Sequence, residues 1–275
     1  MRFCIGAERV EALLGVLERT HPLGMEEREG ELLAYYDSTA SVEDIIRPVE
    51  EDLQRLGARW QSQWIGAENW NARWAESIQP VAVGDAWLIV PAEHATDDLP
   101  CTGKRIYIYP AMAFGTGHHE TTRMMLRALS RLELAGKEVL DAGTGSGILA
   151  IAAMMEGARS VTAVDLHEEA IDNAQYNARL NGIDGIRFVQ ADIRRWRPPH
   201  AFDIVLVNIH RKVVHDFIQK IDLYLRRGGM LVCSGYFATE RHVIERAAQA
   251  VGMSCIDVDR EGEWCCETFV RPIKG

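Results

Sequence analysis

The residues best suited to chemistry begin with a glycine-rich turn. In the run LDAGTGSG, Gly143, Gly145 and Gly147 follow Asp141 at the end of an apolar stretch. Glycine adopts positive φ and lets a ligand approach the backbone, and the helix that begins after the turn offers unpaired amide donors. The spacing predicts a ligand-binding turn, with Asp141, Gly143 and Gly145 as candidate contacts.

Polar residues also stand at the ends of the next three apolar runs. Asp165 and Leu166 end the first in VDL, Asp192 ends the second in QAD, and VNI places Asn208 in the third. A carboxylate at Asp165 can accept both ribose hydroxyls of a nucleoside, and Asp192 can accept the amine of an adenine. Asn208 can hydrogen-bond an amine or a cofactor without adding a charge. Each residue alone could be a solvated strand end or a turn former, but together they predict a nucleoside site.

The predicted nucleoside is not part of a dinucleotide or a triphosphate. The dinucleotide fingerprint G-x-G-x-x-G needs its third glycine at position 148, where this chain has Ile148. A P-loop needs Lys followed by Ser or Thr after the glycines, and neither pair follows here. A dehydrogenase on a similar sheet is therefore the disfavoured alternative.

The run AMAFGTGHHETTRMMLRAL, residues 111–129, could form a metal site, a phosphate cradle or a loop over a pocket. Its His118, His119 and Glu120 are consecutive, so they cannot present the i, i+4 pair of a helical zinc site. The run also lacks the Gly-Lys-Ser/Thr ending of a phosphate cradle. We expect no metal at this position.

A glycine-hinged loop that leads into a helix at Thr121 and Thr122 fits the same run better. Such a loop can fold over a bound cofactor, with Phe114, Thr116 and Gly117 lining the pocket. An ordinary helix cap is the alternative interpretation.

The elements that must position these residues alternate regularly from residue 136 onward. Fully apolar strands that alternate with amphipathic helices predict a parallel sheet covered on both faces, whose ligand crevice lies beyond the carboxyl ends of the strands. The expected strands are 137–143, 160–166, 186–192, 202–209, 230–236 and others within 254–270, and the expected helices are 146–158, 168–182, 215–229 and 238–252.

The N-terminal part has a different pattern. Residues 1–66 predict strand, helix, strand, strand, helix and strand, which is the order of the ferredoxin-like α+β unit. Residues 67–80 predict a linker helix with Trp70 and Trp74 on one face, followed by an α/β domain over 81–275. The small unit shows no catalytic cluster, so we expect it to recognise a partner or to pack.

Composition limits the classes of function. The chain has 275 residues, 47% of them hydrophobic, and a formal net charge of −10, which disfavours direct binding of nucleic acid. Charged residues interrupt the apolar N-terminal positions, so neither a secretory signal nor a membrane span is expected. Six cysteines without a Cys-x-x-Cys pair fit buried, reduced thiols and a cytoplasmic location.

The runs quoted above, together with ENWNARWAESIQPVAVGDAWLIVPA, resemble the ribosomal protein L11 methyltransferases, which use S-adenosylmethionine. The run AFGTGHHETT is the most specific part of the resemblance, and EREGE in the N-terminal unit adds a short match. The resemblance implies a Rossmann-like class I methyltransferase domain and a ferredoxin-like domain that recognises the acceptor. It also implies methylation of lysine side chains or the N-terminus of protein L11, with release of S-adenosylhomocysteine. We expect the protein to be a monomer.

The resemblance further implies cofactor contacts at Thr122, Gly143, Asp165 and Asn208. Asn208 and His119 are the candidates for holding the acceptor amine. The family commonly has Leu and Ala after this Asn-Ile pair, whereas this chain continues with HRKVV from His210. The acceptor could therefore be another protein lysine or a small amine, and a non-catalytic cofactor-binding module is a further alternative.

Overall fold

The structure is a computed structural model that describes residues 1–4, 9–28, 31–36, 40–63, 79–95, 102–109 and 117–273. Contacts between Cα atoms divide the chain into two compact units, Met1–Asn69 and Trp70–Gly275. This division falls inside the predicted linker over 67–80, of which only residues 79 and 80 are described.

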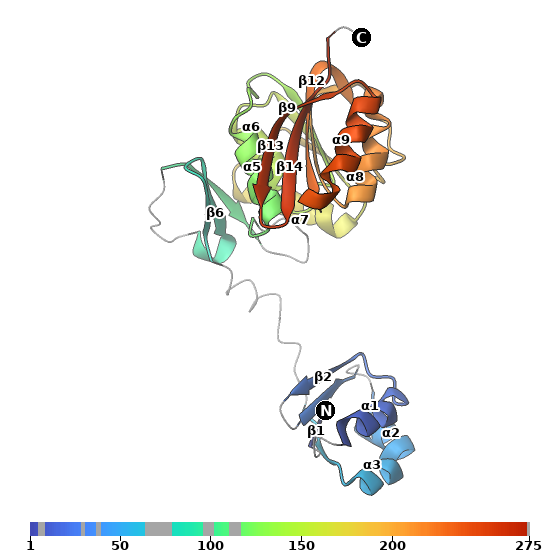
Figure 1. Cartoon of the computed structure of the whole chain (residues 1–275). Helices are drawn as coiled ribbons and strands as arrows, with labels where there is room; N and C mark the ends of the chain where they lie inside the picture. The colour runs from blue at the N-terminus through green and yellow to red at the C-terminus, as the bar shows by residue number, and fades with distance from the viewer. Residues whose placement is uncertain are drawn as a thin grey trace. The chain divides into compact units, whose positions relative to one another are not determined.

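The first unit has the predicted ferredoxin-like order (Figure 1). Its four strands pair antiparallel in the order β2-β3-β1-β4, and its helices bury their apolar sides on that sheet around Phe3, Leu13 and Leu32. The elements are β1 (Arg2–Cys4), α1 (Val10–Glu18), β2 (Gly24–Arg28), β3 (Glu31–Tyr35), α2 (Val42–Ile46), α3 (Glu50–Leu56) and β4 (Arg59–Gln61).

The second predicted helix of this unit is divided in two. The Ser41 hydroxyl accepts the Asp44 amide at 3.1 Å and so caps α2, and Gly57 ends α3 with a φ of 67°. Between them the segment Arg47–Val49 forms a 3-10 turn that contains Pro48. Proline has no amide to donate, which explains why the regular helix stops there.

The second unit is built on a seven-stranded sheet in the order β10-β9-β8-β11-β12-β14-β13. Its first five strands in this order are parallel, and β14 is antiparallel to both of its neighbours. The strands are β8 (Glu138–Ala142), β9 (Ser160–Asp165), β10 (Ile186–Gln190), β11 (Phe202–Asn208), β12 (Leu225–Phe237), β13 (Ser254–Glu261) and β14 (Trp264–Val270).

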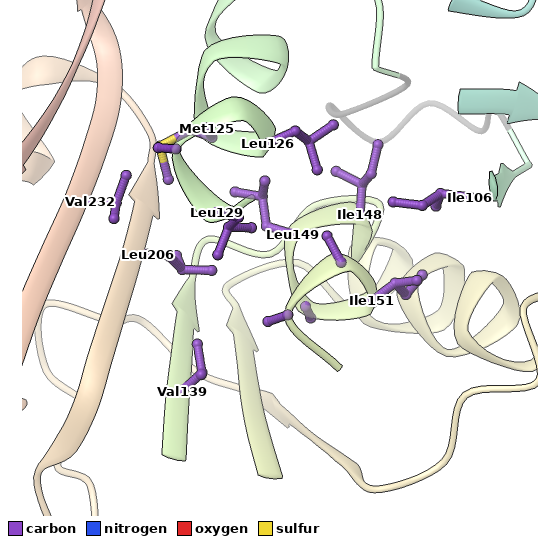
Figure 2. Packing of buried hydrophobic residues seen from close by; sticks show 14 of the residues in the cluster. Ile106, Met125, Leu126, Leu129, Val139, Ile148, Leu149, Ile151, Leu206 and Val232 are labelled. Carbon is purple, nitrogen blue, oxygen red and sulfur yellow. The ribbon is translucent and has the colours of Figure 1, made fainter. Parts of the chain in front are cut away.

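Helices cover both faces of this sheet, as the apolar strands predicted (Figure 1). One face carries α5 (Glu120–Leu129), α6 (Ile148–Met155) and α7 (Glu168–Leu180), and the other carries α8 (Arg211–Ile218) and α9 (Arg241–Ala250). Figure 2 shows buried side chains of α5 and α6 that face Val139, Leu206 and Val232 of the sheet. In the described ranges no helix is both long and apolar enough to cross a membrane.

A second, three-stranded sheet precedes α5 in the same unit. It consists of β5 (Val81–Val83), β6 (Trp87–Pro91) and β7 (Lys104–Ile108). Ile106 of β7 joins the cluster under α5 and α6, and the indole of Trp87 donates to the Leu126 carbonyl at 3.2 Å. The small sheet is therefore packed against the helices of one face.

The predicted helix over 215–229 is wrong in its position. α8 begins at Arg211, after His210, whose Nδ1 accepts the Lys212 amide at 3.3 Å, and it ends at Ile218. The buried Tyr224 donates its hydroxyl to the carbonyls of Ile193 and Trp196, both at 2.8 Å. This long-range anchor fixes a single 3-10 turn before β12 instead of further helix.

The cysteines follow the prediction in part. Cys233, Cys265 and Cys266 are buried free thiols, whereas Cys4 is exposed because it alternates with the buried Phe3 in β1. Cys101 lies outside the described residues.

Candidate active site

The glycine turn lies where the strand order reverses. β8 has β9 on one side and β11 on the other, so the connections that leave these strands diverge to opposite sides. In an open parallel sheet this divergence creates the ligand crevice at the carboxyl ends of the strands. The residues that end β8, β9 and β11 are the ones singled out from the sequence.

Each glycine of the turn has a positive φ, and two of them also lack room for a side chain. The φ values are 79° at Gly143, 53° at Gly145 and 82° at Gly147. A Cβ on Gly143 would lie 2.4 Å from Cγ2 of Ile209, and a Cβ on Gly147 would lie 2.9 Å from Cβ of Ala174. Glycine is thus required here both for the backbone conformation and for close packing.

Asp165 holds the turn from the neighbouring strand. Its Oδ2 accepts the Gly145 amide at 2.9 Å, and its Oδ1 accepts the His167 amide at 3.1 Å. Each carboxylate oxygen has a second lone pair, so both can also accept a ligand hydroxyl. Leu166, the next residue, is 51% exposed and offers an apolar surface at the same edge.

Asp141 is fully buried at the end of β8. Its Oδ2 accepts the Thr144 hydroxyl at 2.6 Å, whereas its Oδ1 has no hydrogen-bond partner in the described part of the chain. Burial raises the pKa of the Asp141 carboxyl from 3.8 to about 7, with the Thr144 hydrogen bond acting in the opposite direction. A buried carboxylate with an unpaired oxygen is suited to a polar or cationic ligand group.

Asp192 has a different environment from the one predicted for an adenine contact. Arg194 donates to both of its carboxylate oxygens, from Nε at 2.9 Å and from Nη2 at 2.8 Å. The Arg194 hydrogen bonds hold the pKa of Asp192 below its usual value. An adenine amine would share these oxygens with the guanidinium.

Asn208 ends β11 beside the turn. In the register of the sheet it lies opposite Ser234 of β12, and β11 places it two residues beyond Leu206, the neighbour of Asp141. Asn208 Oδ1 is buried and has no hydrogen-bond partner among the described residues. A Cβ on Gly235 would lie 2.2 Å from the Ile209 carbonyl oxygen, so glycine lets β12 approach the chain just after Asn208.

The N-terminus of α5 also lies at this edge. His119 is its N-cap, and the His119 Nδ1 accepts the Thr121 amide at 3.2 Å. The His119 ring contacts Trp264 edge-on, with centroids 4.8 Å apart. Trp264 begins β14, which is antiparallel to β12, so its position is at the carboxyl edge of the parallel strands. His119 thus caps α5 at the carboxyl edge of the parallel strands.

The predicted cofactor, S-adenosylmethionine, fits this set of residues. Thr122 Oγ1, Asp141 Oδ1 and Asn208 Oδ1 come from three different elements, and none of these buried atoms has a hydrogen-bond partner within the described ranges. Buried polar atoms are almost always paired in proteins, so three such atoms indicate a polar ligand. Gly117, with a φ of 88°, packs against Ile89 before α5, while Phe114 and Thr116 lie outside the described residues.

Sequence reasoning missed three residues of this neighbourhood. Thr144 stands inside the glycine run and could have been recognised as a partner of Asp141 by its spacing. Trp264 and Asn177 reach the site from distant parts of the chain, and no local pattern indicated either of them.

Comparisons with known proteins point to one family. A model of the family "Ribosomal protein L11 methyltransferase (PrmA)" matches residues 10–272. The ribosomal protein L11 methyltransferase of Bacteroides fragilis is 33% identical over 247 residues, 89% of this chain and 88% of that protein. That of Porphyromonas gingivalis is 34% identical over 248 residues, 89% of this chain and 84% of that protein.

The chain belongs to this family. A crystal structure of ribosomal protein L11 methylase from Lactobacillus delbrueckii subsp. bulgaricus superposes with a TM-score of 0.66 at 30% identity, covering 71% of this chain and all of that one. The protein is therefore a methyltransferase with the Rossmann-like class I fold, as the sequence predicted. The dehydrogenase and the non-catalytic binding module are excluded as alternatives.

Proposed function

We propose that this methyltransferase transfers methyl groups from S-adenosylmethionine to amino groups of ribosomal protein L11, either lysine side chains or the N-terminus. The observation that carries the proposal is the glycine turn at the strand-order reversal, with Asp141 and Asp165 on one side and Asn208 on the other. The family match over residues 10–272 supports the choice of acceptor.

The cofactor would be held by residues of four elements. Gly143 and Gly145 bring the backbone close to it, Asp165 accepts its ribose hydroxyls, and Asp141 offers an oxygen to its polar tail. Leu166 and Asp192 would border its base, and Thr122 of α5 would offer its hydroxyl. Gly117 is a further predicted contact, as are Phe114 and Thr116, which lie outside the described residues. When bound, S-adenosylmethionine supplies a methyl group activated by a sulfonium, and S-adenosylhomocysteine remains.

The protein contributes orientation more than acid–base chemistry. Holding two reactants in line can remove roughly 7 to 11 kcal/mol of barrier. A lysine amine has an ordinary pKa of about 10.4 and attacks only in its neutral form, so a dry site that lowers this pKa favours the reaction. Asn208 Oδ1 can accept an N–H of that neutral amine, and His119 can hold the amine from the N-terminus of α5.

The remaining expectations concern partners and location. The first unit, with its ferredoxin-like sheet, would bind the acceptor protein, and the predicted boundaries at residues 66 and 80 separate it from the catalytic domain. We expect a monomer in the cytoplasm that binds neither nucleic acid directly nor membranes.

The test uses radiolabelled S-adenosylmethionine with three acceptors: unmethylated L11, an unrelated lysine-rich protein and a small primary amine. We expect label in L11 alone, at lysine or N-terminal nitrogen by mass spectrometry. Label in the unrelated protein or in the amine would show that the acceptor is not L11. The HRKVV segment from His210, which departs from the family pattern, would then be consistent with a different acceptor. Absence of label in all three would contradict the proposed reaction.

Replacing Asp165 tests the cofactor site separately. Asp165→Ala removes two hydrogen bonds to a charged group, each worth roughly 1.5 to 3 kcal/mol, so the dissociation constant for S-adenosylhomocysteine should rise by at least about a hundredfold. Asp184→Ala, at an exposed position before β10, is the control and should leave it unchanged. Equal affinities of the two variants in calorimetry would exclude Asp165 as a contact.

A further inference from the structure

Three asparagines form a ladder along one face of α7. Asn173, Asn177 and Asn181 are spaced four residues apart, which places them on the same side of the helix. Asn177 is fully buried and Asn173 is 7% exposed. Asn173 and Asn177 lie within α7, where asparagine is a poor helix former, and Asn181 is its C-cap.

The ladder pairs with the free edge of β7. The Tyr107 amide donates to Asn181 Oδ1 at 2.8 Å, and the Tyr109 amide donates to Asn177 Oδ1 at 2.8 Å. Two strand residues advance by about 6.6 Å and four helix residues by about 6.0 Å, so the two spacings match. The asparagine side chains thus act on this edge as a neighbouring strand would.

Asn177 differs from Asn181 in what its other end binds. Asn177 Nδ2 donates to the Ser146 carbonyl at 2.8 Å, inside the glycine turn, and lies 3.4 Å from Asn173 Oδ1. Asn181 Nδ2 instead donates to Tyr107 and Asn177 carbonyls at 2.6 and 2.8 Å. The Asn177 side-chain oxygen accepts the Tyr109 amide, and its Nδ2 faces the oxygens of Ser146 and Asn173. One orientation of the Asn177 amide group therefore satisfies all three partners.

The glycine turn is tightly packed against α7 at Gly147. A Cβ on Gly147 would already lie 2.9 Å from Cβ of Ala174, which neighbours Asn173 in α7. The Ser146 carbonyl belongs to the peptide that leads into Gly147, whose amide donates to the Thr144 carbonyl at 2.9 Å. A side chain that holds this carbonyl therefore also holds the backbone of the glycine turn.

We propose that Asn177 is a positioning residue for the cofactor site, because its one amide group joins the glycine turn to β7. The proposal rests on the proposed function, since it takes the glycine turn as the site of S-adenosylmethionine. It assigns to Asn177 an effect on cofactor affinity that Asn181, which bonds Tyr107 and the Asn177 carbonyl but not the glycine turn, does not have.

The test compares Asn177→Asp with the matched control Asn181→Asp. Each variant keeps the oxygen that accepts a β7 amide and replaces the donor by a second oxygen. Only Asn177→Asp breaks the bond to Ser146. We expect its dissociation constant for S-adenosylhomocysteine, measured by calorimetry, and its KM for S-adenosylmethionine to rise about tenfold, with kcat changed less than about twofold. For Asn181→Asp we expect a similar loss of Tm and an affinity within about twofold of wild type.

Equal affinities of the two variants would overturn the proposal, as would an Asn177→Asp variant that binds like wild type. Failure of the wild type to bind S-adenosylhomocysteine would instead contradict the proposed function. If Asn177→Asp does not fold, amide hydrogen exchange in the wild type decides the question. Bound S-adenosylhomocysteine should slow exchange of the Tyr109 amide more than that of Tyr107, and equal effects on both would overturn the proposal.

Discussion

Asp141 shows how the fold changes the chemistry of a single residue. From the sequence it is an acid before a glycine turn, whereas in the structure it is fully buried with one unpaired oxygen. Burial penalises its charged form, which is why its pKa rises to about 7. The proposed cofactor site would use this unpaired oxygen.

This pKa predicts a pH dependence of stability. Below 3.8 the carboxyl is protonated in both the folded and the unfolded chain, so burial costs nothing. As the pH rises to about 7 only the unfolded chain loses the proton, and the folded state loses roughly 4 kcal/mol relative to it, at about 1.4 kcal/mol per pKa unit. Above that pH the loss is constant.

Asp141→Asn removes the titration and keeps an oxygen for the Thr144 hydroxyl. The free energy of unfolding of the variant minus that of wild type, from urea titrations, should increase by roughly 3 kcal/mol between pH 5 and pH 8. The other ionisable groups cancel in this difference. A difference that does not vary with pH would show that Asp141 is not buried in its charged form.

At the scale of elements, the close packing of α6 against α7 depends on Gly147. In Gly147→Ala the new Cβ would lie 2.9 Å from Cβ of Ala174, and the alanine would have to adopt a φ of 82°. The left-handed conformation costs about 1 to 2 kcal/mol and overpacking about 1 to 3 kcal/mol, so the free energy of unfolding should fall by roughly 2 to 5 kcal/mol. Binding of S-adenosylhomocysteine should weaken in the same variant.

Gly182→Ala is the matched control, because Gly182 has a φ of 63° and open space around it. It should cost only about 1 to 2 kcal/mol and leave cofactor affinity unchanged. Thermal unfolding and calorimetry measure both quantities. If the two variants were equally stable, the contact between the turn and α7 would not be tight.

Most elements could be predicted because their signals are local. The periodicity that predicts a helix over 168–182 is visible within a dozen residues, and the structure confirms this helix as α7. The segment after β11 could not be predicted, because Tyr224 reaches carbonyls 31 and 28 residues away and these contacts decide where helix ends.

At the scale of the whole molecule, we expect the second unit to bind the cofactor and the first unit to bind the acceptor. A chain of residues 67–275 should bind S-adenosylhomocysteine within about twofold of the full-length protein, because the site draws only on the second unit. Its methylation of L11 at low acceptor concentration should fall by at least about tenfold, since a linked binding unit raises the local concentration of acceptor.

The comparison uses calorimetry and initial rates for both chains. Methylation of L11 at the full rate by residues 67–275 would remove the acceptor-binding role from the first unit. Loss of cofactor binding would instead show that the second unit needs the first to fold.

The sequence by itself determined the order of the elements, the glycine turn and the polar residues at the strand ends, because propensity, periodicity and chain direction are properties of neighbouring residues. Since parallel strands share one carboxyl edge, the sequence also predicted that Asp141, Asp165 and Asn208 lie at the same edge of the sheet. Only the tertiary structure decided that Trp264 lies beside His119, that Asn177 joins β7 to the turn, and that Asp141 has no access to water. These features depend on contacts between distant segments, which packing selects and local sequence does not encode.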